Sequence, residues 1–253
     1  MACAKVPFTN RRQGRLLPES MLSSMALTEY QSFLSQNQLS KNATQAEMVR
    51  TVGENLKQAV VRFYTRTGRA KELANYKWEF NLVESPDINA WCMPGGKVVV
   101  YTGLMPVAQD ADGLAVVMGH EIAHALAHHG NERMSQGLIA QMGGVALQVA
   151  TANQPAQTHN LFMQAYGIGA QVGALLPFSR LQETESDEIG LYLMAMAGYN
   201  PDKAADFWKR MSAKAGAKPP VFLSTHPDDS KRAANLKSLV PKAKMMAEKY
   251  KAS

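Results

Sequence analysis

The chain has 253 residues, of which 46% are hydrophobic and 19% charged, and its formal net charge is +6. This composition is ordinary for a folded globular protein and excludes a chain that is disordered throughout. The two cysteines, Cys3 and Cys92, are too few for a disulfide framework or for a zinc site built from cysteines. No uninterrupted apolar run reaches about 18 residues, which argues against a membrane-spanning helix.

The N-terminal part of the chain predicts an extension followed by a helix. Residues 1–40 are polar and only weakly periodic, so we expect an N-terminal extension before one folded domain over residues 41–253. Within that domain, apolar residues recur at helical spacing from 49 to 63. Gly68 lies just beyond the expected end of this helix, as is typical of helix C-termini.

Three short strands are expected next. Apolar and polar residues alternate from 76 to 83, which is typical of a half-buried strand. Further strands are expected over residues 89–93 and 97–102, with a Pro-Gly-Gly turn between them. These runs indicate a small sheet with neighbouring strands joined by tight connections.

The remainder of the sequence is mostly helical in pattern, and a sheet followed by helices is an α+β arrangement. The expected helices begin at capping residues or prolines and end at glycines. The first expected helix runs from Asp110 or Asp112 to about His129, with Gly130 as the stop. A second runs from Arg180 to Ala197, and a third begins at Asn200-Pro201. Two short basic helices are expected to begin at His226-Pro227 and at Val240-Pro241.

The segment His120-Glu121-Ile122-Ala123-His124 carries the strongest chemical signal. On a helix, residues four apart lie on one face, so both imidazoles can bind one Zn²⁺. Glu121 points to the flank, where it can take a proton from the water that attacks a carbonyl. The pattern H-E-x-x-H is therefore typical of a zinc peptidase, and the alternative is a pair of helix histidines satisfied by hydrogen bonds.

A catalytic zinc needs a third protein ligand and an open position. On a helix, Glu183 and Asp187 share one face, while Glu185 faces away. Glu183 would then bind the metal, and Asp187 would accept a hydrogen bond from a ligand imidazole. The alternative is a solvated acidic helix start that the helix dipole favours.

His226 and Arg232 are further candidates whose roles stay open at this point. His226 would be a third or fourth ligand, a donor to the transition state, or a surface histidine. Arg232 would stabilise an oxyanion or only pair with a carboxylate. His128 continues the four-residue spacing of the motif but lies a full turn further along, and we expect it to face solvent.

Four blocks of the sequence together resemble the Ste24/HtpX/Oma1-like family of zinc metallopeptidases. The resemblance is strongest to its periplasmic lipoprotein branch of BepA-like and LoiP-like proteins, and it is far more specific than the zinc motif alone. The blocks are Asn89 to Gly96 with Thr102-Gly103-Leu104, His120 to His129, Ser179-Arg180 with Glu183 to Asp187 and Gly190, and Thr225-His226-Pro227 with Arg232.

The resemblance implies a zincin-like α+β fold, mostly helical, with a small sheet beside the active-site helix. A substrate would add as a strand at the sheet edge, next to Asn89 and Ala90. The resemblance also implies Glu183 as the third metal ligand and Asp187 as support for a ligand imidazole. It implies that His226 can approach the metal and gate the site.

The start of the chain around Cys3 is similar to mature lipoproteins of this group. We therefore expect a lipid anchor at Cys3 and a location at a membrane in the bacterial periplasm. The apolar segment from Gly137 to Pro177 corresponds to membrane-embedded helices in some relatives. It is too polar for that here, and we expect it to cover or plug the active site.

These observations predict a zinc-dependent endopeptidase with one Zn²⁺ per chain, Glu121 as the base, and His226 or Arg232 assisting. The expected partners are protein or peptide substrates, in particular misfolded or misassembled cell-envelope proteins, and the membrane. One alternative is a chaperone-like or binding protein with a closed, autoinhibited zinc site. Another is a module that binds membranes or nucleic acid through its basic ends. No nucleic-acid motif accompanies that charge, so we expect no nucleic-acid partner.

Overall fold

The larger sheet of the protein has three strands, β3 (Glu79–Val83), β5 (Lys97–Tyr101) and β4 (Ala90–Met93), in that spatial order. β3 runs parallel to β5, and β4 runs antiparallel to β5. Gly95 and Gly96 in the turn between β4 and β5 have φ of 83° and 80°, a conformation that favours glycine. The computed structural model describes residues 2–142, 155–166, 179–214, 220–226 and 231–251.

Helices surround this sheet, and several begin at side chains suited to capping. The side chains of Asn42, Asp110 and Ser179 accept backbone N–H groups at the starts of α2, α4 and α8. These caps satisfy amides that have no partner inside the helix. The α-helices of the described residues are α1 (Glu19–Gln36), α2 (Ala43–Arg66), α3 (Met105–Ala108), α4 (Ala111–Leu126), α5 (His129–Met142), α7 (Pro155–Tyr166), α8 (Arg180–Met196), α9 (Ala204–Ser212), α10 (Val221–Thr225) and α11 (Arg232–Lys249).

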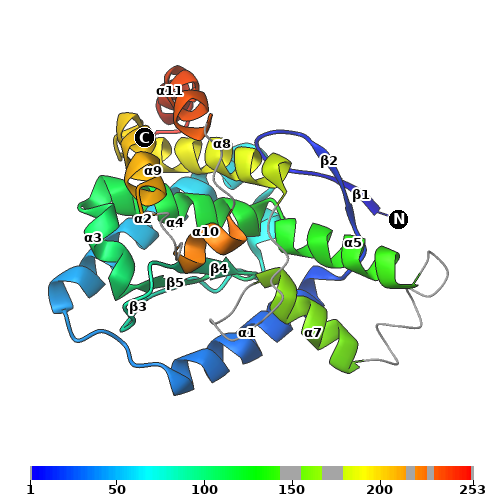
Figure 1. Ribbon diagram of the computed structural model, residues 1–253. Coiled ribbons are helices and arrows are strands. Elements are labelled where there is room, and N and C mark those ends of the chain that lie inside the picture. The colour runs from blue at the N-terminus through cyan, green and yellow to red at the C-terminus, as the bar shows by residue number, and fades with distance from the viewer. Residues whose placement is uncertain (1, 143–154, 167–178, 215–219, 227–230, 252–253) are drawn as a thin grey trace.

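The sheet lies between two layers of helices, with α1 on one side and α4 on the other (Figure 1). Val98 and Val100 of β5 belong to the core shared with α2, α4 and α8. Val99 and Tyr101 belong to a second core with α1, α5 and α7. Side chains alternate between the two faces of a strand, so β5 is buried on both faces. The fold class expected from the sequence, a mostly helical α+β protein with a small sheet beside the motif helix, is confirmed.

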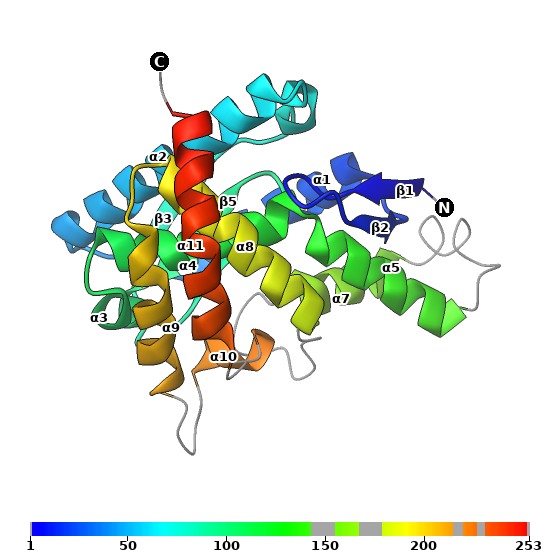
Figure 2. The same cartoon turned by 90° about the horizontal axis from the view of Figure 1, so that it is seen from above.

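The helices α4 and α8 cross at unusually close range, with α11 lying over α8 (Figure 2). A Cβ atom at Gly190 of α8 would lie only 2.8 Å from the backbone nitrogen of His120 in α4. A Cβ atom at Gly119 would lie 3.0 Å from the carbonyl oxygen of Gly190. The two glycines therefore allow α8 to lie directly against α4, the helix that carries the two motif histidines.

The first 40 residues form regular structure that packs on the rest of the chain. β1 (Ala2–Lys5) and β2 (Arg12–Arg15) make an antiparallel hairpin. Apolar side chains of α1 are buried in the second core, and Leu39 forms a bridge to Val83 of β3. The boundary at residue 40 stays a prediction. Among the described residues, no helix is long and apolar enough to cross a bilayer.

The expected helix through His129 was wrong at its C-terminal end. α4 ends at Leu126, His128 adopts a left-handed conformation with φ of 54°, and α5 begins at His129. A left-handed residue is common just after a helix, although glycine is the usual choice. The turn changes the direction of the chain, and the ring of His129 thereby reaches the ring of His124 instead of continuing along the face of α4.

The expected helix start at Val240-Pro241 was also wrong, because α11 continues through Pro241. Proline removes one helical hydrogen bond. On either side of it, Leu236 and Ala243 are buried in the core, and this burial holds the helix together. Residues 227–230 lie outside the described part of the chain.

The expectation that residues 137–177 cover the active site falls largely on residues 143–154 and 167–177, outside the described part of the chain. Within that range, α7 is described, and its Leu161 and Phe162 are buried with side chains of α1 and α5 in the second core. This helix therefore packs on the side of the sheet opposite α4.

Candidate metal centre

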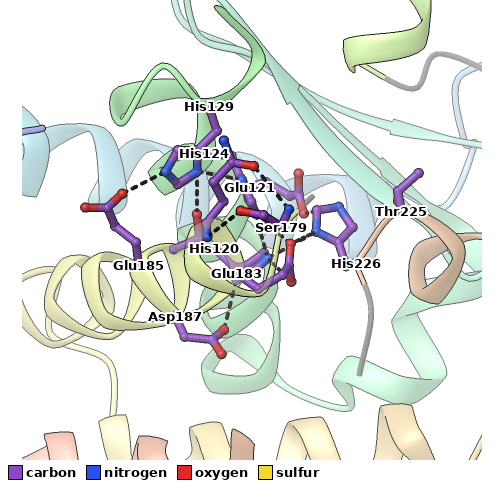
Figure 3. A network of polar contacts seen from close by, with 12 residues as sticks. His120, Glu121, His124, His129, Ser179, Glu183, Glu185, Asp187, Thr225 and His226 are labelled. Atoms are coloured by element: carbon purple, nitrogen blue, oxygen red, sulfur yellow. Dashed lines mark hydrogen bonds and ion pairs between the residues drawn. The ribbon is translucent and has the colours of Figure 1, made fainter. Parts of the chain in front are cut away.

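Four buried side chains from three separate segments form one cluster: His120 and His124 of α4, Glu183 of α8, and His226 just after α10 (Figure 3). One potential ligand atom from each lies within 4.8 Å of the others. Each residue is at most 5% exposed. The structure thus brings both motif histidines together with the two side chains that the sequence singled out further along the chain.

The spacing of the four-residue cluster fits a tetrahedral metal ion. Ligand atoms about 2.1 Å from a tetrahedral ion are roughly 3.4 Å apart. His120 Nε2 lies 3.0 Å from His124 Nε2 and 3.3 Å from His226 Nδ1. Glu183 Oε1 lies 3.3 Å from His124 Nε2 and 2.9 Å from His226 Nδ1. These separations are close to those expected for atoms that surround one tetrahedral ion.

Charge in the cluster favours a cation. Burial opposes ionisation of Glu183, but His226 and His120 hold its pKa well below the ordinary range. Burial likewise opposes a proton on His120, whereas Glu183 and Asp187 raise its pKa to about 9. A proton and a metal ion compete for the same nitrogen lone pair, so these carboxylates favour a bound metal as well. Glu183 Oε2 is buried and accepts no hydrogen bond from the described residues.

Glu121 lies beside the cluster rather than in it. Its Oε1 is 3.4 Å from His226 Nε2 and accepts no hydrogen bond from the described residues. Burial is the main reason that the pKa of Glu121 lies above its ordinary value. The Glu121 carboxylate thus has a raised pKa, lies beside the four-residue cluster, and has an oxygen that accepts no hydrogen bond from the described residues. Such a group is suited to accept and return a proton.

Asp187 and Arg232 contact the opposite side of His120. Asp187 Oδ1 lies 3.0 Å from His120 Nδ1 and accepts a hydrogen bond of 2.7 Å from Arg232 Nη2. The guanidinium carbon of Arg232 is 3.2 Å from the centre of the Trp208 ring. Arg232 Nη2 is also 3.3 Å from Glu183 Oε2. Arg232 therefore pairs with carboxylates, and its role toward an oxyanion stays a prediction.

The expected substrate edge belongs to the sheet that packs against α4, whereas the expected lipid anchor lies in the N-terminal hairpin. Ala90 begins β4, an edge strand of the three-stranded sheet among the described residues, and Asn89 precedes it. Both are buried, and the carbonyl of neighbouring Ile88 accepts a hydrogen bond from Phe222 N in α10. Cys3 lies in β1, and its side chain is outside the described part. The roles of Asn89, Ala90 and Cys3 stay predictions.

Three residues near the cluster had no role in the sequence-based site. His129 Nδ1 lies 2.9 Å from His124 Nδ1, Glu185 lies next to His129, and Arg11 lies next to Glu185. Glu185 was expected to face away from the metal, and it does not belong to the cluster. Motif spacing did not single out these residues, because each contact joins segments that are distant in sequence or follows from the turn at His128.

The sequence profile of Peptidase family M48 matches residues 51–240. The chain is 39% identical over 178 residues to Mitochondrial metalloendopeptidase OMA1 of Schizosaccharomyces pombe, covering 70% of this chain and 50% of that protein. The OMA1 of Saccharomyces cerevisiae is 33% identical, with 70% and 51% covered. Beta-barrel assembly-enhancing protease of Escherichia coli is 28% identical, with 64% and 34% covered.

The chain thus spans about half the length of the two yeast relatives, and a third of the bacterial one. The family match includes all four members of the cluster as well as Glu121 and Asp187. It confirms the resemblance to the Ste24/HtpX/Oma1-like family that was inferred from the sequence blocks. The chain therefore belongs to peptidase family M48.

Proposed function

We propose that this chain is a zinc-dependent endopeptidase. The observation that carries the proposal is the buried cluster of three imidazoles and one carboxylate, with the Glu121 carboxylate beside it. Histidine and carboxylate ligands in a tetrahedral arrangement fit Zn²⁺ better than Mg²⁺ or Ca²⁺, which prefer oxygen ligands. The names of the related metalloendopeptidases support the same reaction.

In this proposal His120, His124 and Glu183 hold the metal. When bound, the zinc ion supplies a Lewis acid that makes water more acidic and polarises the substrate carbonyl. Glu121 takes the proton from the attacking water and returns it to the leaving amine. Asp187 holds the ring of His120 through its Nδ1 atom, so that Nε2 faces the cluster.

Purified chain should contain about one zinc per molecule and should cleave an unfolded protein such as reduced casein. Glu121→Gln keeps the shape of the side chain and touches no ligand atom, so zinc content should stay at one while cleavage falls at least about 100-fold. His124→Ala and Glu183→Ala should both lose zinc. An unchanged cleavage rate in Glu121→Gln, or a folded chain that takes up no zinc, would contradict the proposal.

The position of His226 favours one alternative, a chaperone-like or binding protein with a closed site. With His226 Nδ1 2.9 Å from Glu183 and 3.3 Å from His120 Nε2, four protein atoms would surround the metal and leave no position for substrate. His226→Ala distinguishes the two functions. Faster cleavage in this variant indicates a peptidase that His226 restrains, whereas zinc without cleavage in both forms indicates a binding protein.

Misfolded or misassembled cell-envelope proteins are the substrates that we propose for this activity. The printed name of the bacterial relative, which refers to β-barrel assembly, supports this class. Addition of the substrate as a strand at β4, next to Asn89 and Ala90, is part of the same proposal. A lipid at Cys3 and a periplasmic location stay expectations from the sequence.

A further inference from the structure

A chain of buried polar contacts leads from the candidate metal ligand His124 to the loop of the N-terminal hairpin. We propose that Arg11, in that loop, is a positioning residue for metal binding, which acts on His124 through Glu185 and His129. The inference rests on the proposed function in one respect, namely that the four-residue cluster binds a metal. It assigns the N-terminal hairpin a part in the metal centre.

The first contact joins the rings of His124 and His129 (Figure 3). His124 Nε2 faces the cluster, 3.0 Å from His120 Nε2, so its other nitrogen Nδ1 must carry the proton when a metal is bound. His124 Nδ1 lies 2.9 Å from His129 Nδ1. A hydrogen bond from His124 then requires that His129 Nδ1 is the unprotonated nitrogen of its ring.

The second contact fixes the proton of His129 at the opposite nitrogen. His129 Nε2 lies 3.0 Å from Glu185 Oε2, and His129 is fully buried. An ionised carboxylate only accepts hydrogen bonds, so His129 Nε2 has to carry the proton and donate it. Ser186 Oγ lies 3.2 Å from His129 Nδ1, next to the contact with His124. Glu185 therefore sets the tautomer of His129, which in turn orients His124.

The third contact ties Glu185 to the hairpin. Arg11 donates from Nε to Glu185 Oε2 at 2.7 Å, and Thr9 Oγ1 donates to Glu185 Oε1. The other two nitrogens of Arg11 donate to both oxygens of Glu132 in α5, at 2.8 and 2.9 Å. Arg11 thus holds two carboxylates from different helices at fixed positions, with three of its five N–H groups engaged in charge-assisted hydrogen bonds.

Contacts with α2 and with the turn after α4 hold the hairpin in place, and they thereby fix the position of Arg11. Phe8 and Asn10 have φ of 68° and 60°, and this tight loop turns Thr9 and Arg11 toward the same carboxylate. The ring of Phe8 stacks on Phe63 of α2, with centroids 3.7 Å apart. Gln13 Nε2 donates to the carbonyl of Ala127, in the turn between α4 and α5, at 2.9 Å. If the hairpin moved away from Phe63 and Ala127, Arg11 would lose its contact with Glu185.

Arg11→Gln in the full chain tests the proposal, with Arg12→Gln as the matched control. Both variants lose one positive charge from the same hairpin, but Arg12 is exposed. Zinc affinity is measured by competition with a chromophoric chelator, and the geometry of the centre by the visible spectrum of Co²⁺-loaded protein. Loss of groups that support metal ligands typically weakens affinity about 10–100-fold. We expect that loss, with an altered Co²⁺ spectrum, for Arg11→Gln, and affinity within about twofold of wild type for Arg12→Gln.

A simple structural role for Arg11 predicts a different result. If the ion pairs only hold the hairpin down, Arg11→Gln lowers thermal stability and leaves zinc affinity and the Co²⁺ spectrum unchanged, and the proposal is overturned. It is also overturned if Arg11→Gln weakens zinc binding equally in a His129→Phe background, where the route to His124 is cut. If Arg11→Gln does not fold, Glu185→Gln, which keeps the Arg11–Glu132 pair, has to show the same loss of affinity. Wild-type chain that binds no zinc would instead refute the proposed function.

Discussion

Replacing Gly190 with alanine tests whether the close crossing of α4 and α8 holds the candidate metal centre together. The added Cβ would lie 2.8 Å from His120 N, 2.9 Å from Gly119 C and 3.0 Å from His120 Cα. These backbone atoms belong to a helix and cannot rotate away as the end of a side chain does. An ordinary contact of 3.4 Å therefore requires α8 to move from α4 by about 0.6 Å.

The expected effect on stability follows from two opposing contributions. Overpacking of a buried contact costs typically about 1–3 kcal/mol, and alanine in place of glycine inside a helix returns about 1 kcal/mol. Gly190→Ala should therefore lower the free energy of unfolding by up to about 2 kcal/mol. For a chain of this size that corresponds to a decrease in Tm of up to roughly 8 °C.

The same displacement should weaken metal binding, because Glu183 and Asp187 are placed on His120 by the crossing of the two helices. We expect zinc affinity to fall at least about tenfold, as when groups around metal ligands are disturbed. Urea unfolding of chelator-treated protein gives the stability, and chelator competition gives the affinity.

Gly137→Ala is the control for this experiment. In α5, a Cβ at position 137 meets only the side-chain end of Leu161, at 3.3 Å, which can shift. Stability should stay the same or rise, and zinc affinity should not change. Wild-type stability and affinity in Gly190→Ala would show that the crossing accommodates a methyl group, and the reasoning about close approach would be refuted.

Two further predictions concern carboxylates around the cluster. Asp187→Asn removes the charge that faces His120 Nδ1 and Arg232, so zinc affinity in chelator competition should fall about 10–100-fold, and an unchanged affinity would exclude this supporting role. Burial opposes ionisation of Glu132, but Arg11 and Gln182 hold its pKa below the ordinary 4.5. A lowered folded-state pKa contributes stability that is complete above about pH 4.5 and is lost as pH falls through the folded pKa. Urea unfolding between about pH 7 and pH 3 should therefore depend less on pH in Glu132→Gln than in wild type, and equal slopes would contradict the assignment.

Much of the fold follows from residues close together in sequence. Helical spacing from 49 to 63 predicted the core of α2, the run from 97 to 102 predicted β5, and Arg180 to Ala197 closely matches α8. Periodicity, caps and turn glycines act within a few residues, so the sequence carries them directly. Prediction failed at the end of α4 and at Pro241, where burial of neighbouring side chains and a left-handed histidine outweighed local preference.

The sequence by itself determined the chemistry at the centre, namely two imidazoles one helical turn apart with a carboxylate between them. It also determined that Glu183 and Asp187 lie on one face of their helix and Glu185 on another. Only the tertiary structure decided which distant groups surround them. Arg11 and Glu185 are 174 positions apart in the chain, yet their side chains are hydrogen-bonded at 2.7 Å. No local pattern encodes such a contact, because it depends on how closely α4 and α8 cross and on the turn that brings His129 back to His124.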